Sequence, residues 1–89
     1  SVLPKLKGAK PVRSRTVSAY VTETQIAAPL RDIQDRFEQV AIGSYPFTHE
    51  GKFATSLVVR GTDADLLDSV CGEMEQLLRG IGEVFDPES

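Results

Sequence analysis

Few side chains in this sequence are able to do chemistry: one histidine, one cysteine and a group of aspartates. His49 is followed by Glu50, but a general base needs an oriented partner and a group to activate within hydrogen-bond reach, and neither adjoins it. We therefore interpret His49 as a solvated turn residue. Cys71 lies among acidic residues, which do not favour a thiolate, so we expect a small structural side chain there.

The aspartates Asp63, Asp65 and Asp68 raise the question of a divalent cation. The first two fit the start of a helix, where carboxylates cap backbone N–H groups, and Asp68 fits a solvated position. A hard cation also needs more oxygen ligands held in one loop. A lone cysteine excludes an internal disulfide and a paired-cysteine metal site, and makes a reducing cytoplasm the simplest compartment. We expect no metal and no catalytic residue.

One further stretch, Gly43, Ser44, Tyr45 and Pro46, has two interpretations. In the first it is structural: a bulged edge strand running into a turn, since glycine weakens a strand and proline cannot donate to a ladder. In the second it is a contact surface in which Tyr45 offers an apolar ring with a polar tip. Physical reasoning favours the structural interpretation and leaves the contact surface open.

Hydrophobic periodicity predicts the elements that position these residues. Alternation of apolar and polar residues predicts strands, and apolar residues at three- and four-residue spacing predict two amphipathic helices. The strands are expected at residues 15–21, 40–47, 52–60 and 83–85, with a turn at 48–51.

The helix ends follow from capping residues. The first helix is expected to begin near Gln25 or Ile26 with Thr24 as its cap, because Pro29 is tolerated only in the first turn. The second is expected to begin after Thr62, which forms a capping box with Asp65. At its end, Gly80 and Gly82 offer left-handed termination.

The element order β-α-β-β-α-β predicts an α+β, ferredoxin-like sandwich. Its four-stranded antiparallel sheet has the order 4-1-3-2, with both helices on one face. The other face stays open, and the alternation places Tyr20 and Val58 on it. An open face of this kind is a docking surface for a partner or a parent domain.

The residues do not fit three other known uses of this architecture. The loop at residues 22–25 has neither the paired cysteines of a metal chaperone nor the glycine and arginine of an anion cradle. RNA recognition needs stacking aromatics on the central strands, where Thr55 and Ser56 stand instead. Residues 16–89 also hold five basic and thirteen acidic residues, a net charge of −8. We therefore expect no nucleic acid partner.

Residues 1–15 differ from the rest, since they hold five basic residues and no acid. Proline and glycine interrupt this segment, so we expect a solvated, poorly ordered linker at residues 1–14. The compact domain is expected at 15–86, followed by a frayed tail at 87–89. No apolar run reaches the ~18 residues of a membrane span, and the first residues lack the pattern of a secretory signal.

The run from Ile42 to Pro46 resembles a recurring stretch of one family, and the resemblance continues through residues 53–63. It is similar to the C-terminal region of molybdopterin-binding (MoaB/Mog-like) proteins of the competence/damage-inducible protein A type. That type is in turn similar to the N-terminal half of FAD synthase. Residues 3–6 resemble the end of the last helix of the Mog-like domain, and residues 13–17 the start of the appended domain.

The resemblance implies a bacterial, cytoplasmic parent protein whose Mog-like domain, with a molybdopterin or nucleotide site, precedes this chain. That domain is the implied partner, and a homo-oligomer is possible. The chain itself would be a non-catalytic accessory or interaction domain without a cofactor. Two alternatives stay open: residues 43–46 form a ligand-recognition lip for the parent's active site, or the fragment is an independent small hydrolase. The tentative contact residues are Gly43, Ser44, Tyr45, Pro46, Tyr20 and Val58.

Overall fold

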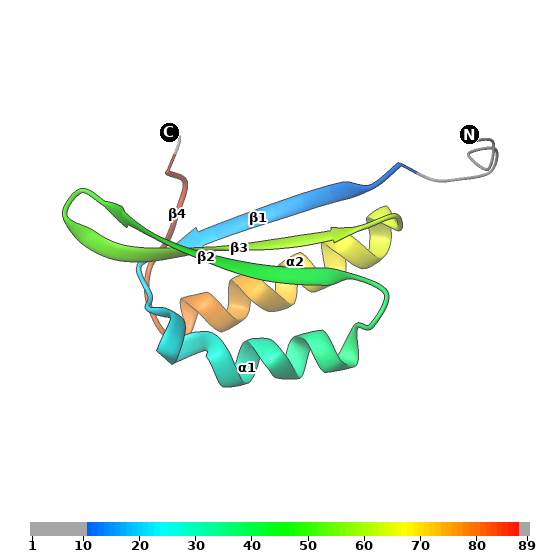
Figure 1. Ribbon diagram of the computed structural model, residues 1–89, viewed down its shortest axis with the longest axis horizontal. Helices are drawn as coiled ribbons and strands as arrows, with labels where there is room; N and C mark the ends of the chain where they lie inside the picture. Colours follow the sequence, from blue (N-terminus) through cyan, green and yellow to red (C-terminus); the bar gives the residue numbers. More distant parts are fainter. Residues whose placement is uncertain (1–10, 88–89) are drawn as a thin grey trace, which may run out of the picture.

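The computed structural model describes residues 11–87 of the chain. Expectations for residues 1–10 and 88–89, including most of the linker and the end of the tail, lie outside this range. The six elements follow one another in the predicted order (Figure 1). They are β1 (Arg13–Ala19), α1 (Glu23–Arg36), β2 (Ala41–His49), β3 (Lys52–Gly61), α2 (Ala64–Arg79) and β4 (Val84–Phe85).

The strands form one antiparallel sheet in the order β2-β3-β1-β4, which is the predicted 4-1-3-2 arrangement. Both helices lie on the same side of this sheet (Figure 1). β3 is central and pairs with β1 and β2 along its length, while β2 lies at an edge. The ferredoxin-like sandwich is therefore confirmed. β1 begins at Arg13, two residues before the predicted start of the domain at residue 15, because Arg13 and Ser14 pair with Gly61 and Arg60.

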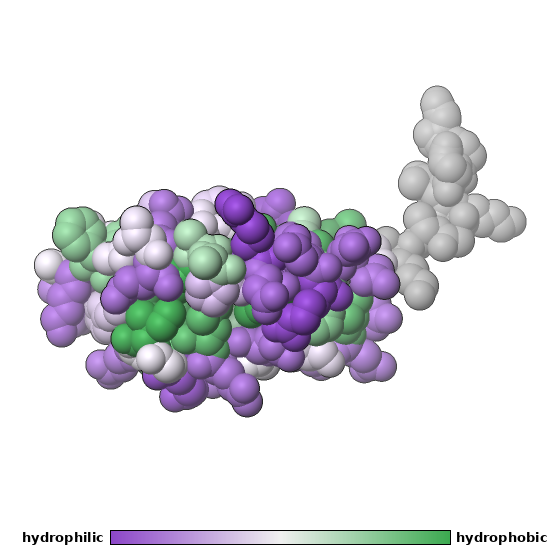
Figure 2. Space-filling view, turned by 90° about the horizontal axis from the view of Figure 1, so that it is seen from below, coloured by the Kyte–Doolittle hydropathy of each residue, from purple (hydrophilic) through white to green (hydrophobic). Residues whose placement is uncertain are grey.

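The hydrophobic core lies between the sheet and the helices. Alternate residues of β1 and β3 point into it, and α2 supplies its most buried side chains. The side chains with no exposed surface include Leu57, Val59, Leu67, Val70, Met74 and Leu78. Seen from the helix side, the surface is largely hydrophilic, and apolar residues gather toward the end where the β2–β3 hairpin lies (Figure 2).

Helix α1 begins earlier than predicted. Its N-cap is Thr22 rather than Thr24, and the backbone N–H of Thr22 donates to Gln25 Oε1 over 2.9 Å. A polar residue three positions after the cap satisfies an otherwise unpaired donor. Pro29 consequently lies beyond the first turn, contrary to prediction, and cannot donate the usual backbone hydrogen bond to the carbonyl of Gln25.

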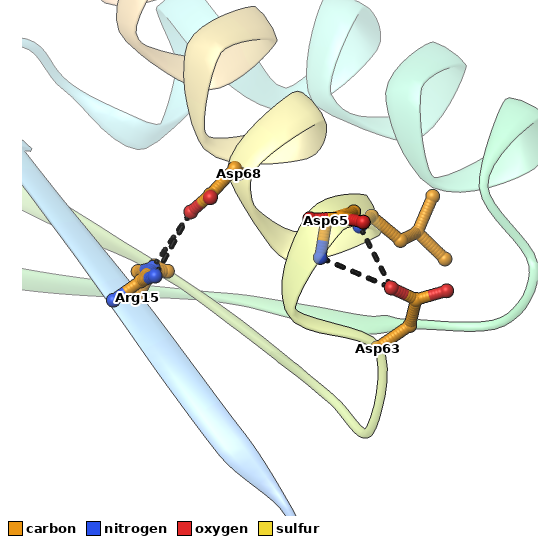
Figure 3. A network of polar contacts seen from close by, with 5 residues as sticks. Arg15, Asp63, Asp65 and Asp68 are labelled. Atoms are coloured by element: carbon orange, nitrogen blue, oxygen red, sulfur yellow. Dashed lines mark hydrogen bonds and ion pairs between the residues drawn. The ribbon is translucent and has the colours of Figure 1, made fainter.

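Helix α2 also differs at both ends. Asp63, not Thr62, is the N-cap, and its Oδ1 accepts from the N–H groups of Asp65 and Leu66 (Figure 3). The predicted left-handed termination is wrong, since Gly80 has φ −76° and Gly51 alone among the described glycines has positive φ. Gly82 is needed for close approach: a Cβ there would lie 2.4 Å from the carbonyl oxygen of Tyr20.

The edge strand β2 is longer and more regular than predicted. Its pairing with β3 runs without a bulge from Ala41, opposite Arg60, to His49, opposite Lys52. Glu50 and Gly51 alone make the turn, with φ values of 52° and 79°. Positive φ at both positions is typical of the two-residue turn whose twist matches that of the strands. His49 is thus the last residue of a strand, not a turn residue.

Candidate functional site

The face of the sheet opposite the helices is the candidate site, and we call it the open face. Register identifies its residues, because partners directly across an antiparallel ladder share a face. Ser18 lies opposite Ser56, and Ser56 lies opposite Tyr45. The next rung toward the N-terminus of β1 joins Thr16, Val58 and Gly43. The structure therefore places Val58 on the open face, together with two residues of the 43–46 stretch.

One end of the open face carries four ring side chains, which we call the aromatic cluster: Tyr20, Phe47, His49 and Phe85. The rings of Tyr20 and Phe85 are stacked, with centroids 4.1 Å apart and an interplanar angle of 14°. His49 and Phe47 lie 4.7 and 6.1 Å from the Phe85 ring. Three distant segments of the chain meet here, and the contacts anchor the two-residue strand β4.

Tyr20 also has polar partners at its rim. Its hydroxyl lies 2.9 Å from Nδ1 of His49, and Nζ of Lys52 lies 5.1 Å from its ring centroid. Desolvation of the ring and, next, the negative charges of Glu50 and Glu83 raise the pKa of Tyr20. The phenol is therefore neutral at physiological pH and serves as a hydrogen-bonding group.

The middle of the open face has small side chains. The hydroxyls of Ser18 and Ser56 lie 2.7 Å apart, and Ser18 is only 3% exposed. Tyr45 rises beside them with 50% of its surface exposed. Its ring lies across Gly43, where a Cβ would come within 3.1 Å of the Tyr45 hydroxyl. The missing side chain at Gly43 therefore leaves space for the Tyr45 ring, and the predicted bulge is not present at this position.

The 43–46 stretch does not form one surface. Gly43 and Tyr45 lie on the open face, whereas Ser44 pairs with Leu57 and Pro46 with Thr55, both of which face the core. Ser44 Oγ donates to Oε2 of Glu23 over 3.1 Å, at the start of α1. Of the predicted contact residues, the structure brings Tyr20, Val58, Gly43 and Tyr45 to the open face and turns Ser44 and Pro46 to the helix side.

Sequence reasoning missed three members of the aromatic cluster: Phe47, His49 and Phe85. The signal was present, because alternation from Tyr45 places residues 47 and 49 on the same face if the strand continues. The predicted turn at 48–51 interrupted that alternation. The contact of Phe85 had no local signal, since it depends on where β4 returns to the sheet.

The other chemistry-bearing residues have structural partners. Burial, followed by the charge of Glu75, raises the pKa of the Cys71 thiol, so this side chain is a poor nucleophile. Asp68 is not simply solvated, because its Oδ1 accepts from Nη2 of Arg15 over 2.9 Å (Figure 3). Within residues 11–87 no three His, Cys, Asp or Glu side chains gather as a metal site would require. No helix in that range has the length and apolarity to cross a membrane.

These features define a small α+β sandwich domain with one helix-covered face and one aromatic-bearing open face. Residues 11–85 match the family model described as FAD synthase, middle domain, and the chain belongs to that family. This match confirms the part of the resemblance that concerns FAD synthase. No curated protein and no solved structure matches the chain. By its description the family is one part of an enzyme, which accords with the expectation that this fragment is not catalytic by itself.

Proposed function

We propose that this chain is a non-catalytic interaction domain that packs its open face against a neighbouring domain of the same FAD synthase-type protein. The observation that carries the proposal is the half-exposed Tyr45 beside the aromatic cluster, on a face that no helix of residues 11–87 covers. Aromatic residues are enriched in protein interfaces because their rigid rings bury much apolar area at a low entropic cost.

The geometry of this face suits an interface with some polar character. Tyr45 offers a large ring with a hydroxyl at its tip, and the hydrogen-bonded pair Ser18 and Ser56 leaves a shallow floor beside it. Val58 adds a partly exposed apolar side chain one rung away. A surface that combines aromatic rings with hydroxyl groups is of the mixed kind that non-obligate protein contacts use.

The proposed occupant is the Mog-like domain that the resemblance of residues 3–6 implies, lying before this chain in a bacterial, cytoplasmic protein. Any molybdopterin or nucleotide would bind to that domain, and this chain would hold its orientation. The family description as a middle domain supports a position between other parts of a protein. The alternative of a ligand-recognition lip has less support, because residues 43–46 divide between two faces.

The experiment compares the intact protein with variants of its open face. Tyr45→Lys places a charge in the proposed interface, and Phe53→Lys is the matched control, because Phe53 is 77% exposed on the helix side of the same hairpin. We expect Tyr45→Lys to raise amide hydrogen exchange across residues 16–20 and 54–58 of the intact protein, and Phe53→Lys to leave it unchanged. Equal exchange in both variants and in the unaltered protein would exclude this interface.

The same variants separate the alternative. If Tyr45 formed a ligand lip, Tyr45→Lys would weaken binding of a pterin or nucleotide probe to the intact protein without changing exchange on the rest of the open face. If it lies in a domain interface, exchange rises over the whole face. An unaltered probe affinity together with raised exchange is the result that the proposal predicts.

A further inference from the structure

The outer edge of β1 is largely unpaired. β1 spans seven residues and pairs with β3 along all of them. On its other side it pairs with β4 at Ser18 and Ala19 only. Among the described residues, no strand pairs with this edge of β1 at residues 13–17. An unpaired edge of this kind presents a row of backbone donors and acceptors to any extended chain that reaches it.

The direction of those groups follows from the ladder. The N–H of Tyr20 donates to the carbonyl of Glu83, on the β4 side, over 2.9 Å. Because backbone groups alternate along a strand, those of Ser18, Thr16 and Ser14 point to the same side. The backbone N–H and C=O groups of Ser18 pair with Phe85 of β4. Ser14 and Thr16 have no partner strand on this side among the described residues, and both residues are exposed. Thr16 and Ser14 therefore direct two donors and two acceptors outward.

Pro87 explains why β4 stops short. The register that sets Ser18 opposite Phe85 would set Thr16 opposite Pro87 at the next hydrogen-bonded pair. Proline has no N–H to donate to the carbonyl of Thr16, so one of the two hydrogen bonds of that pair cannot form and the ladder is weakened there. Pro87 thus disfavours extension of β4 along β1, and within residues 11–87 no strand pairs with this edge at Thr16.

A hollow of about 770 Å³ lies beside this edge, between β1, β4 and α2. Val17 and Cys71 form part of its wall on the helix side. Val17 is buried and Cys71 is partly buried, whereas Glu75 and Asp86 also line the hollow, so its surface is part apolar and part acidic. An added strand would therefore place apolar side chains in the hollow and acidic ones nearer Arg13 and Arg15. The edge therefore offers both backbone pairing and room for side chains.

We propose that the free edge of β1 accepts an extended acidic peptide segment as a fifth strand of the sheet. The charge of β1 selects the chemistry of this segment. Arg13 and Arg15 flank the outward-facing Ser14, and Arg15, which also pairs with Asp68, keeps nearly half of its side chain exposed. Carboxylates on alternate positions of an added strand would lie opposite these arginines, where opposite charges stabilise a cross-strand pair.

A second copy of this chain fits the edge less well. In an antiparallel pair of two β1 strands, the register that matches Ser14 with Thr16 sets Arg15 opposite Arg15 of the other copy. The register centred on Ser14 sets Arg13 opposite Arg15. Like charges directly opposite each other destabilise a strand pair. A register centred on Thr16 would require Ser18, whose outward groups already pair with β4.

The test uses the 89-residue chain and a soluble capped peptide, about eight residues long, that alternates valine and glutamate. In one control peptide lysine replaces glutamate. In the other, alternate backbone nitrogens are methylated, which removes the N–H donors of the ladder. We expect the first peptide to shift the NMR signals of Ser14 and Thr16 and to protect their amides from exchange. The amides of Arg15 and Val17 point toward β3 and should be protected with or without peptide.

Two protein variants separate pairing from simple charge attraction. Thr16→Pro removes an outward N–H without breaking the β1–β3 ladder, and Thr16→Val is its matched control. We expect Thr16→Pro to lower the affinity for the glutamate peptide by about tenfold. Thr16→Val should bind this peptide as tightly as the unaltered chain does. Arg13→Glu changes an exposed side chain outside the core, so this variant should fold. It therefore tests the proposal even if Thr16→Pro does not fold. It should weaken binding, most at low salt.

Several outcomes would overturn the proposal. One is the absence of shifts at Ser14 and Thr16 at millimolar peptide, and another is equal binding of the glutamate, lysine and methylated peptides. Shifts confined to Tyr45 and the aromatic cluster would move the site to the open face. Protection of Ser14 and Thr16 that rises with protein concentration in the absence of peptide would make a second copy the occupant.

Discussion

The two faces of the sheet are made by the same strands but have different chemistry. The covered face contributes buried aliphatic side chains such as Leu57 and Val59, which α2 seals from water. The open face carries small hydroxyls in its middle and partly exposed rings at one end. The difference teaches that core packing and exposed surface are divided between alternate residues of each strand. A substitution should therefore change one property or the other according to the face it occupies.

The largest effect is expected on the covered face. Leu57 has no exposed surface, so Leu57→Ala should lower the free energy of unfolding by about 2–5 kcal/mol, through lost transfer energy and a cavity. Its neighbour Val58 faces the other way and is partly exposed, so Val58→Ala should cost about 1 kcal/mol or less. Urea unfolding of both variants measures the comparison. Equal losses would mean that the two faces do not differ in energetic weight.

The second effect tests close packing where α2 returns toward β4. Gly82→Ala would bring its Cβ within 2.4 Å of the Tyr20 carbonyl oxygen, and the required backbone shift should cost about 1–3 kcal/mol. Gly72 is the matched control, since it lies exposed within α2 with no atom within 4 Å of an added Cβ. Gly72→Ala should raise stability by about 0.5–1 kcal/mol through helix propensity. Thermal unfolding of the pair would refute this packing argument if both substitutions stabilised the chain.

A smaller effect is expected at the rim of the covered face, where Arg15 of β1 pairs with Asp68 of α2. Their side chains are 48% and 63% exposed, so Asp68→Asn should cost no more than about 1 kcal/mol, and less at high salt. Unfolding at low and high ionic strength measures this contribution. A large loss that salt does not reduce would show that the pair acts through packing.

The smallest effect lies on the open face and depends on pH. Because the pKa of Tyr20 is raised by desolvation and by Glu50 and Glu83, the folded state holds the phenolic proton more tightly than the unfolded state. This contribution is present below the ordinary pKa of 10.0 and is lost as pH rises through the folded-state pKa. The unaltered chain should therefore lose stability above pH 10.0 relative to Tyr20→Phe. If the free energies of unfolding of the two proteins changed equally with pH in this range, the prediction would be contradicted.

Local patterns predicted the elements well but their ends less well. Thr24 and Thr62 were reasonable caps by residue type, yet Thr22 and Asp63 hold those positions. Several adjacent residues in each segment are suitable caps. The choice between them depends on where the preceding strand leaves the sheet, which is set by contacts distant in sequence. The same cause moved Pro29 out of the first turn.

The candidate site was predicted in part for a related reason. Alternation placed Tyr20 and Val58 on the open face, because the side-chain period of a strand is local. It did not separate Ser44 and Pro46 from Gly43 and Tyr45, since those four residues were considered as one surface. The cluster around Phe85 brings together three segments of the chain, and no single segment carries the signal for it.

By itself, the sequence determined the order of strands and helices, their buried faces and therefore the sandwich, because hydrophobic periodicity and crossover handedness leave few alternatives. It also determined the end of β4, since Pro87 has no N–H for the next rung. Only the tertiary structure decided which rings meet on the open face and which edge of β1 stays unpaired. Both depend on the register between distant strands, and register is fixed when the whole sheet packs onto its helices.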